Sequence, residues 1–147
     1  MDLLGELDAG RRCERLIVGF WRCLDLNDYD GMLKRLHPEA SWLRLGKLLR
    51  RRDEVLQALK ARSRTLYIHH IVTNVQCDIA PDLQQAKFFC YLTVYRHNDG
   101  NVYEWPVPLA GPWTINVCTA DLRLGADGWL ISYLSNTPSF SADVKPR

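Results

Sequence analysis

The sequence predicts an α+β fold in which amino-terminal helices pack on one side of a curved antiparallel sheet. In the first part of the chain, apolar residues recur every three or four positions, which is the period of an amphipathic helix. From His69 onward the period changes to two, which is typical of strands that bury one face. Asp99-Gly100 and Asp127-Gly128 separate successive strand-like runs, and such dipeptides favour antiparallel hairpins. Helices followed by a meander of strands give an α+β architecture.

The first two helices are predicted to lie side by side. Segment 9–26 has a wide apolar face that must cover another element. Leu26-Asn27-Asp28 interrupts this pattern, and Asp28 is placed to cap a short second helix that begins at Tyr29 and stops before Pro38.

The remaining elements follow from the same two periods. A short strand is predicted at 40–45 and a third helix at 55–60. The long strand-like runs are 70–79, 86–96, 113–123 and 129–134. Segment 103–112 contains three prolines, which are rare in central strands, so it is predicted to be an ordered loop.

Length and composition predict one globular domain, residues 1–147. With 147 residues, 47% of them hydrophobic, the chain has enough apolar material for a single core. Its 19 basic and 17 acidic side chains give a net charge of +2, which indicates neither nucleic-acid binding nor attachment to an anionic membrane. We therefore expect no nucleic-acid partner and no membrane partner.

Cysteine usage and the amino terminus predict a soluble, cytoplasmic protein. The five cysteines are odd in number and include no C-x-x-C pair, which disfavours a disulfide framework and a zinc site. Charged residues precede the first apolar run, unlike in a signal peptide, and no segment approaches the ~20 apolar residues of a membrane span. We expect no metal site.

Basic residues are concentrated locally in segment 44–64. They are Arg44, Lys47, Arg50, Arg51, Arg52, Lys60, Arg62 and Arg64. One interpretation is a solvated helix face with its entry loop. The other is a patch that steers an anionic substrate or a protein partner.

The run 86–96 predicts an interface. Alternate residues form two faces, one of Ala86, Phe88, Cys90, Leu92 and Val94 and the other of Lys87, Phe89, Tyr91, Thr93 and Tyr95. An aromatic face on a small domain often meets another subunit. We therefore expect a homo-oligomer, either a dimer or a trimer.

The candidate catalytic residue is His70, in a histidine pair that leads directly into a β-branched run. Histidine can exchange protons near neutral pH. Alternation places His69 on the opposite side of the strand from His70. Regular alternation would also place Asn74 with His70 and Val75 on the other face, so either a bulge intervenes or the pocket is partly polar.

Several short motifs together resemble the SnoaL-like branch of the nuclear transport factor 2-like superfamily. They are Leu24-Asp25, Asp28-Tyr29-Asp30, His37-Pro38-Glu39-Ala40, His70-Ile71-Val72-Thr73-Asn74-Val75 and Asp127-Gly128-Trp129-Leu130-Ile131. The resemblance covers about residues 16–134. It implies a cystatin-like, cone-shaped barrel built from the curved sheet and the amino-terminal helices.

The resemblance also implies a catalytic pair. Asp25 and His70 fall where scytalone dehydratase and hexachlorocyclohexane dehydrochlorinase keep their aspartate and histidine, of which the histidine takes a proton from carbon and the aspartate orients it. This chemistry requires no metal and no organic cofactor. Asn116 stands on the strand that carries a second histidine in scytalone dehydratase, and Leu43 or Arg44 stands where ketosteroid isomerase has its base. Those two specific activities are therefore disfavoured.

Further residues are candidates for binding a substrate. They are Trp21, Tyr29, Trp42, Asn74, Trp113 and Asn116. A mostly apolar lining with a few polar groups suits a small apolar, aromatic or polyketide-like molecule.

The resulting hypothesis is a cofactor-independent general acid/base enzyme of the lyase, dehydratase, cyclase or isomerase type, with His70 as base and Asp25 as its orienter. Two alternatives remain open. One is a non-catalytic small (β) subunit like that of the aromatic-ring-hydroxylating dioxygenases, in which a similar motif is mainly structural. The other is a scaffold that binds a small ligand.

Overall fold

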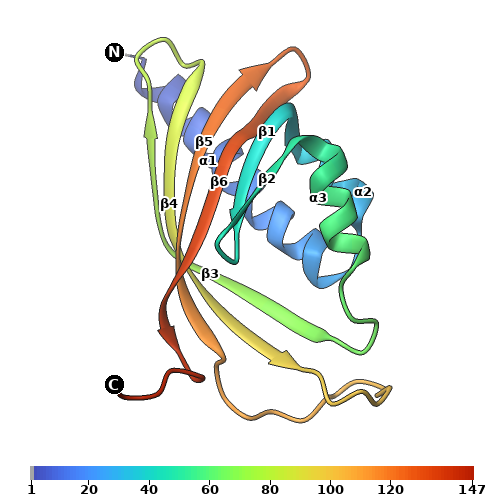
Figure 1. Cartoon of the computed structure of the whole chain (residues 1–147). Coiled ribbons are helices and arrows are strands. Elements are labelled where there is room, and N and C mark those ends of the chain that lie inside the picture. Colours follow the sequence, from blue (N-terminus) through green and yellow to red (C-terminus); the bar gives the residue numbers. More distant parts are fainter. Residues whose placement is uncertain (1) are drawn as a thin grey trace.

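A curved sheet with helices on one side forms the described part of the chain, residues 2–147 of a computed structural model (Figure 1). The helices are α1 (Leu3–Asp25), α2 (Tyr29–Arg35) and α3 (Arg51–Lys60). The strands are β1 (Leu36–Arg44), β2 (Lys47–Arg50), β3 (Tyr67–Ile79), β4 (Gln85–His97), β5 (Thr114–Gly125) and β6 (Gly128–Ser141). The predicted α+β class is confirmed. Met1, the first residue of the expected domain, lies outside the described residues.

The sheet departs from the predicted all-antiparallel barrel in two ways. Its strand order is β2-β1-β6-β5-β4-β3, and it stays open between its two edge strands. In addition, β1 pairs with β6 in parallel, with Trp42 opposite Leu134. Only strands joined by a tight hairpin must be antiparallel. Most of the chain separates β1 from β6, so no local turn determines their relative direction.

Two of the three helices, α1 and α2, begin where a capping side chain accepts from an amide of the first turn, whereas α3 has no such cap. The side chain of Asp28 accepts a hydrogen bond from the Gly31 amide at 2.9 Å, so the predicted cap of α2 is confirmed. Asp2 plays the same part for α1, because it accepts from the Gly5 amide at 3.0 Å. This cap starts α1 at Leu3, six residues earlier than the apolar periodicity indicates.

Two strand boundaries also differ from the prediction. β1 already begins at Leu36, and β2 is an additional short, mostly exposed strand. The β1–β2 hairpin turns at Leu45 and Gly46, whose φ angles of 51° and 76° are those of the tight turns that favour a two-residue hairpin loop. Apolar periodicity did not indicate β2 because Leu49 is its one buried residue.

The core lies between α1 and the inner face of the sheet. On α1 the buried residues follow helical spacing, and on β4 alternate residues are buried, as predicted. The buried set on these two elements is Ala9, Cys13, Ile17, Phe20, Trp21, Cys23, Leu24, Ala86, Phe88, Cys90, Leu92 and Val94. The cysteines are all free thiols in the described chain. No helix within residues 2–147 is long and apolar enough to cross a membrane.

A β-bulge in β3 decides which of its side chains face the core. Thr73 pairs with Tyr91 and Gln76 pairs with Phe89, so two residues of β3 oppose one residue of β4. Asn74, in the bulge, has a left-handed φ of 54° and is exposed. Beyond the bulge the alternation reverses, so that the His70 side of β3 is continued by Val75 rather than by Asn74. The bulge thus resolves the conflict in the sequence pattern.

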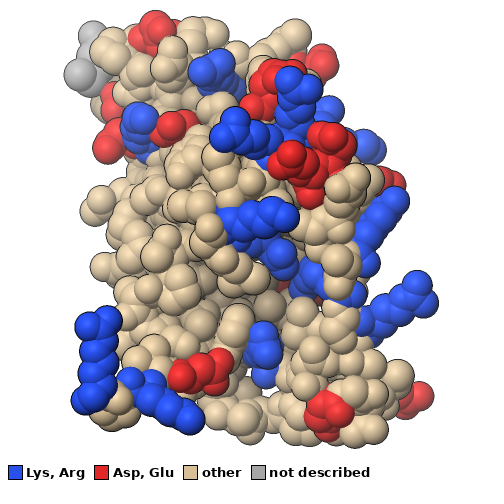
Figure 2. All heavy atoms as spheres, in the orientation of Figure 1, with Lys and Arg blue, Asp and Glu red and all other residues tan. Residues whose placement is uncertain are grey.

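The basic segment 44–64 divides into two groups. Figure 2 shows Lys and Arg side chains gathered on the side of the molecule where β2 and α3 lie. Most of the segment's basic residues are exposed, whereas Arg44, Arg52 and Arg62 are half-buried. The solvated-face interpretation therefore fits only part of the segment.

The bulge provides a test of the backbone conformation at Asn74. We expect Asn74→Val to lower the free energy of unfolding by about 1–2 kcal/mol, because a left-handed φ is costly for a side chain branched at Cβ. Asn74→Gly should be neutral or stabilising at the same position, since glycine adopts this φ without strain. Urea unfolding of both variants measures the difference, and equal stabilities would contradict the left-handed bulge.

Candidate active site

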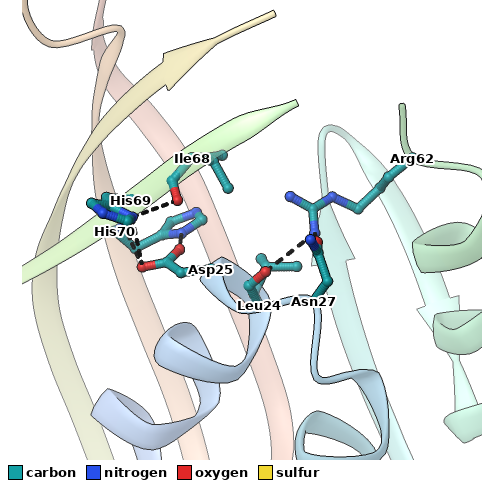
Figure 3. A network of polar contacts seen from close by, with 7 residues as sticks. All are labelled: Leu24, Asp25, Asn27, Arg62, Ile68, His69 and His70. Carbon is teal, nitrogen blue, oxygen red and sulfur yellow. Dashed lines mark hydrogen bonds and ion pairs between the residues drawn. The ribbon is translucent and has the colours of Figure 1, made fainter. Parts of the chain in front are cut away.

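Asp25 and His70 form a hydrogen-bonded pair between the end of α1 and β3 (Figure 3). The Oδ1 atom of Asp25 lies 2.6 Å from the Nδ1 atom of His70. The backbone N–H of His70 donates to the other carboxylate oxygen, Oδ2, at 3.0 Å. The two side chains are only 13% and 7% exposed. The carboxylate is therefore held at both oxygens by the same residue, away from most solvent.

These contacts explain why a carboxylate is tolerated at the end of α1. A negative charge beside a helix carboxyl terminus is unfavourable by about 0.3–1 kcal/mol. The two hydrogen bonds from His70 compensate, because a bond to an ionised group contributes about 1.5–3 kcal/mol. A carboxylate can only accept, so Nδ1 carries the hydrogen that points at Asp25. In a neutral ring the lone pair is then on Nε2, which is the atom available to take a proton.

An aromatic cluster fixes the His70 ring. Trp21 stacks on the imidazole with 4.8 Å between ring centroids and 28° between planes. Trp21 also makes an edge contact with Trp42 at 5.9 Å, and Phe20 contacts both indoles. The Trp42 Nε1 atom donates to the side-chain oxygen of Asn136 at 2.8 Å, which fixes that indole. Both tryptophans are only 1% exposed, so they hold the imidazole in place from the core side.

Two polar side chains of β5 face the same interior. Thr114 and Asn116 are 5% and 6% exposed, and their Oγ1 and Oδ1 atoms have no hydrogen-bond partner within residues 2–147. The strand register places His70 opposite Val94, which in turn lies opposite Thr114. Thr114 and His70 therefore lie in the same cross-strand row, separated by one strand. At ordinary strand spacing their Cα atoms are about 10 Å apart. Buried polar groups are almost always hydrogen-bonded, so these two are suited to a bound ligand.

The other predicted binding residues lie at varying distances from the pair. Tyr29 is half-buried at the start of α2. Trp113 is engaged elsewhere, because its Nε1 donates to Asp143 at 2.7 Å and the Arg96 guanidinium lies 4.0 Å from its ring centroid. Asn74 is exposed at the bulge. The structure therefore groups Asp25, His70, Trp21 and Trp42, adds Asn116 on the same face, and leaves Asn74 and Trp113 outside this group.

Segment 103–112 is an ordered loop, as predicted, and it covers a second region of β3. The Tyr67 hydroxyl accepts a hydrogen bond from the Tyr103 amide at 2.7 Å and donates to the Tyr103 carbonyl at 2.9 Å. Trp105 stacks on His69 with 5.2 Å between centroids. A largely apolar pocket of about 420 Å³ lies between this loop and β3 and β4. His69 lines this pocket and His70 does not, although His69 Nδ1 also lies 3.9 Å from Oδ2 of Asp25.

Two half-buried arginines, Arg44 and Arg62, lie near the groups described above, and the sequence motifs did not single them out. Arg62 Nη1 donates to the Leu24 carbonyl and to the Asn27 side chain, both at 3.4 Å, beside Asp25. Burial lowers the pKa of the Arg44 guanidinium, the nearby charge of Arg62 lowers it further, and Tyr29 acts in the opposite direction. A basic segment was the only signal for either residue, and it could not separate these two from their exposed neighbours.

The arrangement contains no evident metal site. Within residues 2–147, no three His, Cys, Asp or Glu side chains converge in a way that could hold a metal ion. The chemistry that this geometry offers is proton transfer by a buried imidazole whose partner is a carboxylate.

Comparison with known proteins gives the family. The model of the SnoaL-like domain matches residues 5–135. The chain belongs to the SnoaL-like family. No curated protein sequence matches the chain.

Solved structures share the fold of this SnoaL-like domain. A type 2 hexachlorocyclohexane dehydrochlorinase (LinA) is 12% identical with a TM-score of 0.77, over 98% of this chain and 94% of that one. A proposed scytalone dehydratase from Novosphingobium aromaticivorans DSM 12444 is 13% identical, with a TM-score of 0.76. The match covers 97% of this chain and 92% of that one. A proposed dehydratase of the NTF2-like family from Streptomyces avermitilis is 17% identical, with a TM-score of 0.74. The match covers 92% of this chain and 99% of that one. At these identities the likeness establishes the fold, a cystatin-like NTF2 fold with an open sheet.

The Asp25–His70 pair predicts a measurable contribution to stability. Asp25→Ala should lower the free energy of unfolding by about 1–3 kcal/mol, because it leaves the half-buried donors of His70 without their acceptor. Glu14→Ala, at an exposed site within the same helix, is the matched control and should change stability by less than about 0.5 kcal/mol. Chemical denaturation of both variants makes the comparison, and a neutral Asp25→Ala variant would contradict the role of these two bonds.

Proposed function

We propose that this SnoaL-like domain is a cofactor-independent general acid/base enzyme of the lyase, dehydratase, cyclase or isomerase type. The observation that carries this proposal is the 2.6 Å contact between Asp25 Oδ1 and His70 Nδ1, reinforced by the backbone bond to Oδ2. An imidazole oriented by a buried carboxylate is the arrangement expected of a general base. His70 is the base, and Asp25 is the residue that orients it.

The proposed reaction begins with proton abstraction from carbon. Nε2 of His70 takes a proton from a carbon next to an electron-withdrawing group such as a carbonyl, and the electron pair of the C–H bond moves onto the carbonyl oxygen. The negative charge of Asp25 stabilises the imidazolium that forms. The enolate then either expels a leaving group from the adjacent carbon or is reprotonated at another carbon. The imidazolium returns its proton to the leaving group or to that carbon, so His70 is regenerated.

Polar groups on the inner face of β5 can stabilise the developing charge. The side-chain amide of Asn116 and the hydroxyl of Thr114 can both donate to an anionic oxygen, and their buried positions strengthen such a bond. Tyr29 is a third candidate donor from the helical side. The apolar surroundings of these groups favour a small aromatic or polyketide-like substrate.

The structural neighbours support the reaction class by analogy. Three of them are named as a dehydratase, a scytalone dehydratase and a dehydrochlorinase, and each of these names denotes elimination of a small molecule. A shared fold carries many functions, so this support is weaker than that of the Asp25–His70 geometry itself.

Deuterium incorporation into 1-tetralone, followed by mass spectrometry in heavy water, tests the proposed base directly. We expect the wild-type chain to accelerate exchange at the carbon next to the carbonyl. His70→Ala should lower that rate by about 100-fold or more, the usual contribution of a general base, and Asp25→Asn should also lower it strongly. His69→Ala removes the neighbouring exposed imidazole and should keep the rate within about threefold.

The same experiment has clear contrary outcomes. Equal exchange rates for the wild type and His70→Ala would remove His70 from the mechanism. A loss of rate in His69→Ala as large as that in His70→Ala would locate the active base in the outer pocket instead.

We further propose that the outer face of β3 and β4 binds a second copy of this chain. Phe89 and Tyr91 form an edge-to-face pair there, with centroids 5.3 Å apart, and Tyr91 and Ile71 are 38% and 46% exposed. Adjacent exposed apolar side chains on a small domain are typical of an interface.

We also propose a cytoplasmic location. The free cysteines are consistent with it, because a reducing compartment keeps thiols from forming disulfides.

Tyr91→Glu should convert the oligomer into a monomer, because it places a charge in the centre of the proposed interface. Light scattering coupled to size-exclusion chromatography measures the mass of the wild type and the variant. A monomeric wild type would contradict the second-copy proposal. Co-purification of this domain with a larger Rieske-type oxygenase would instead support the alternative of a non-catalytic small subunit.

A further inference from the structure

Two half-buried arginines lie near one another, and one of them contacts the end of α1 that carries Asp25. Arg62 reaches the carbonyl of Leu24 and the side chain of Asn27, each at 3.4 Å. Figure 3 shows its guanidinium on one side of this helix end and His70 on the other. Arg44, at the end of β1, lies with its Cζ atom 5.5 Å from the Trp42 ring centroid. One cationic group, Arg62, therefore contacts the helix end, and a second, Arg44, lies near Arg62.

Neither guanidinium is paired with a carboxylate. All ion pairs within 4.0 Å in residues 2–147 involve other side chains. Both arginines are half-buried, whereas partly buried cations in proteins are normally paired. Arginine retains its charge in such surroundings. Two positive charges therefore lie near one another, and neither has a carboxylate within 4.0 Å in residues 2–147.

The rest of the basic segment behaves differently. Arg51 pairs with Glu39 at 3.5 Å, and Arg52 donates to the Leu36 carbonyl at 3.0 Å. The exposed Arg64 is available to solvent. Arg52 is also half-buried without an acidic partner, and Arg44 and Arg62 differ from it because they lie near one another, with Arg62 at the end of α1.

We propose that Arg44 and Arg62 bind a carboxylate of the substrate, so that the substrate is a small aromatic or polyketide-like organic acid. A guanidinium presents parallel N–H donors that match the two oxygens of a carboxylate. This inference deepens the proposed function and rests on it for the identity of the ligand as a substrate. Binding of the anion itself requires no catalysis.

The aromatic cluster connects the two parts of the proposed site. Trp42 lies beneath Arg44, Trp21 contacts Trp42, and His70 stacks on Trp21. In this proposal the carboxylate of the substrate binds the arginines and its acidic carbon lies beside Nε2 of His70. Neutralising the carboxylate also reduces its repulsion of the charge that develops when a proton is removed from a nearby carbon.

Isothermal titration of the full chain with two matched ligands tests the subsite. The probes are 2-naphthoate and 2-naphthamide, which share an apolar body and differ in charge. We expect 2-naphthoate to bind at least about tenfold more tightly than 2-naphthamide. Arg44→Gln and Arg62→Gln should each lower the affinity for 2-naphthoate by about tenfold. The affinity for 2-naphthamide should change by less than about twofold.

Two controls separate a ligand contact from a structural role. Arg64→Gln removes an exposed arginine from the same segment and should leave both affinities unchanged. Arg44→Lys and Arg62→Lys retain the positive charge and should recover part of the preference for the acid. Three results would overturn the proposal. The wild type binds the two probes with equal affinity, the glutamine variants lose affinity for both probes equally, or 2-naphthoate does not bind.

The outcome is independent of the proposed catalysis. His70→Ala should lower the rate of deuterium exchange by about 100-fold or more and still bind 2-naphthoate. A chain whose exchange depends on His70 but which does not distinguish acid from amide would refute only the carboxylate subsite. A chain with the acid preference but no dependence of exchange on His70 would refute only the base.

Discussion

The arrangement of the proposed site depends on one carboxylate that joins a helix to the edge of the sheet. Asp25 is the last residue of α1, and both of its oxygens accept hydrogen from His70 of β3, at 2.6 and 3.0 Å. One of these donors is the backbone, so the carboxylate fixes the position of the strand as well as the direction of the ring. Because β3 is an edge strand, this contact and the packing of α1 supply restraint that a second neighbouring strand would give elsewhere in the sheet.

Packing and backbone geometry serve the same pair of residues. Trp21 covers one side of the imidazole and is itself held by Phe20 and Trp42, so the ring has little freedom to turn away from Asp25. Further along β3, the bulge at Asn74 reverses the alternation and lets the rest of the strand bury its apolar side chains. The first half of the strand can therefore carry a polar residue on its inner face while the second half packs against the core.

The sequence was informative where a property is local and less so where it depends on distant residues. Helical and strand periods predicted the α+β class and most elements, and the motifs around Asp25 and His70 predicted a pair that the structure joins. The parallel pairing of β1 with β6 could not be predicted, because no turn connects these strands. Asn74 was expected beside His70 under regular alternation, and only the left-handed backbone of the bulge removes it. Arg44 and Arg62 are distinguished from their exposed neighbours by partial burial, which spacing along the chain does not reveal.

The proton on the His70 ring tests the central claim most directly. A long-range ¹H–¹⁵N correlation spectrum, recorded at a pH where the imidazole is neutral, distinguishes its two nitrogens. The Asp25 contact predicts a protonated Nδ1 and an unprotonated Nε2 in the wild-type chain, and loss of that preference in Asp25→Ala. A neutral His70 that carries its proton on Nε2 in the wild type would contradict the account, because the atom proposed to accept a proton from the substrate would already hold one.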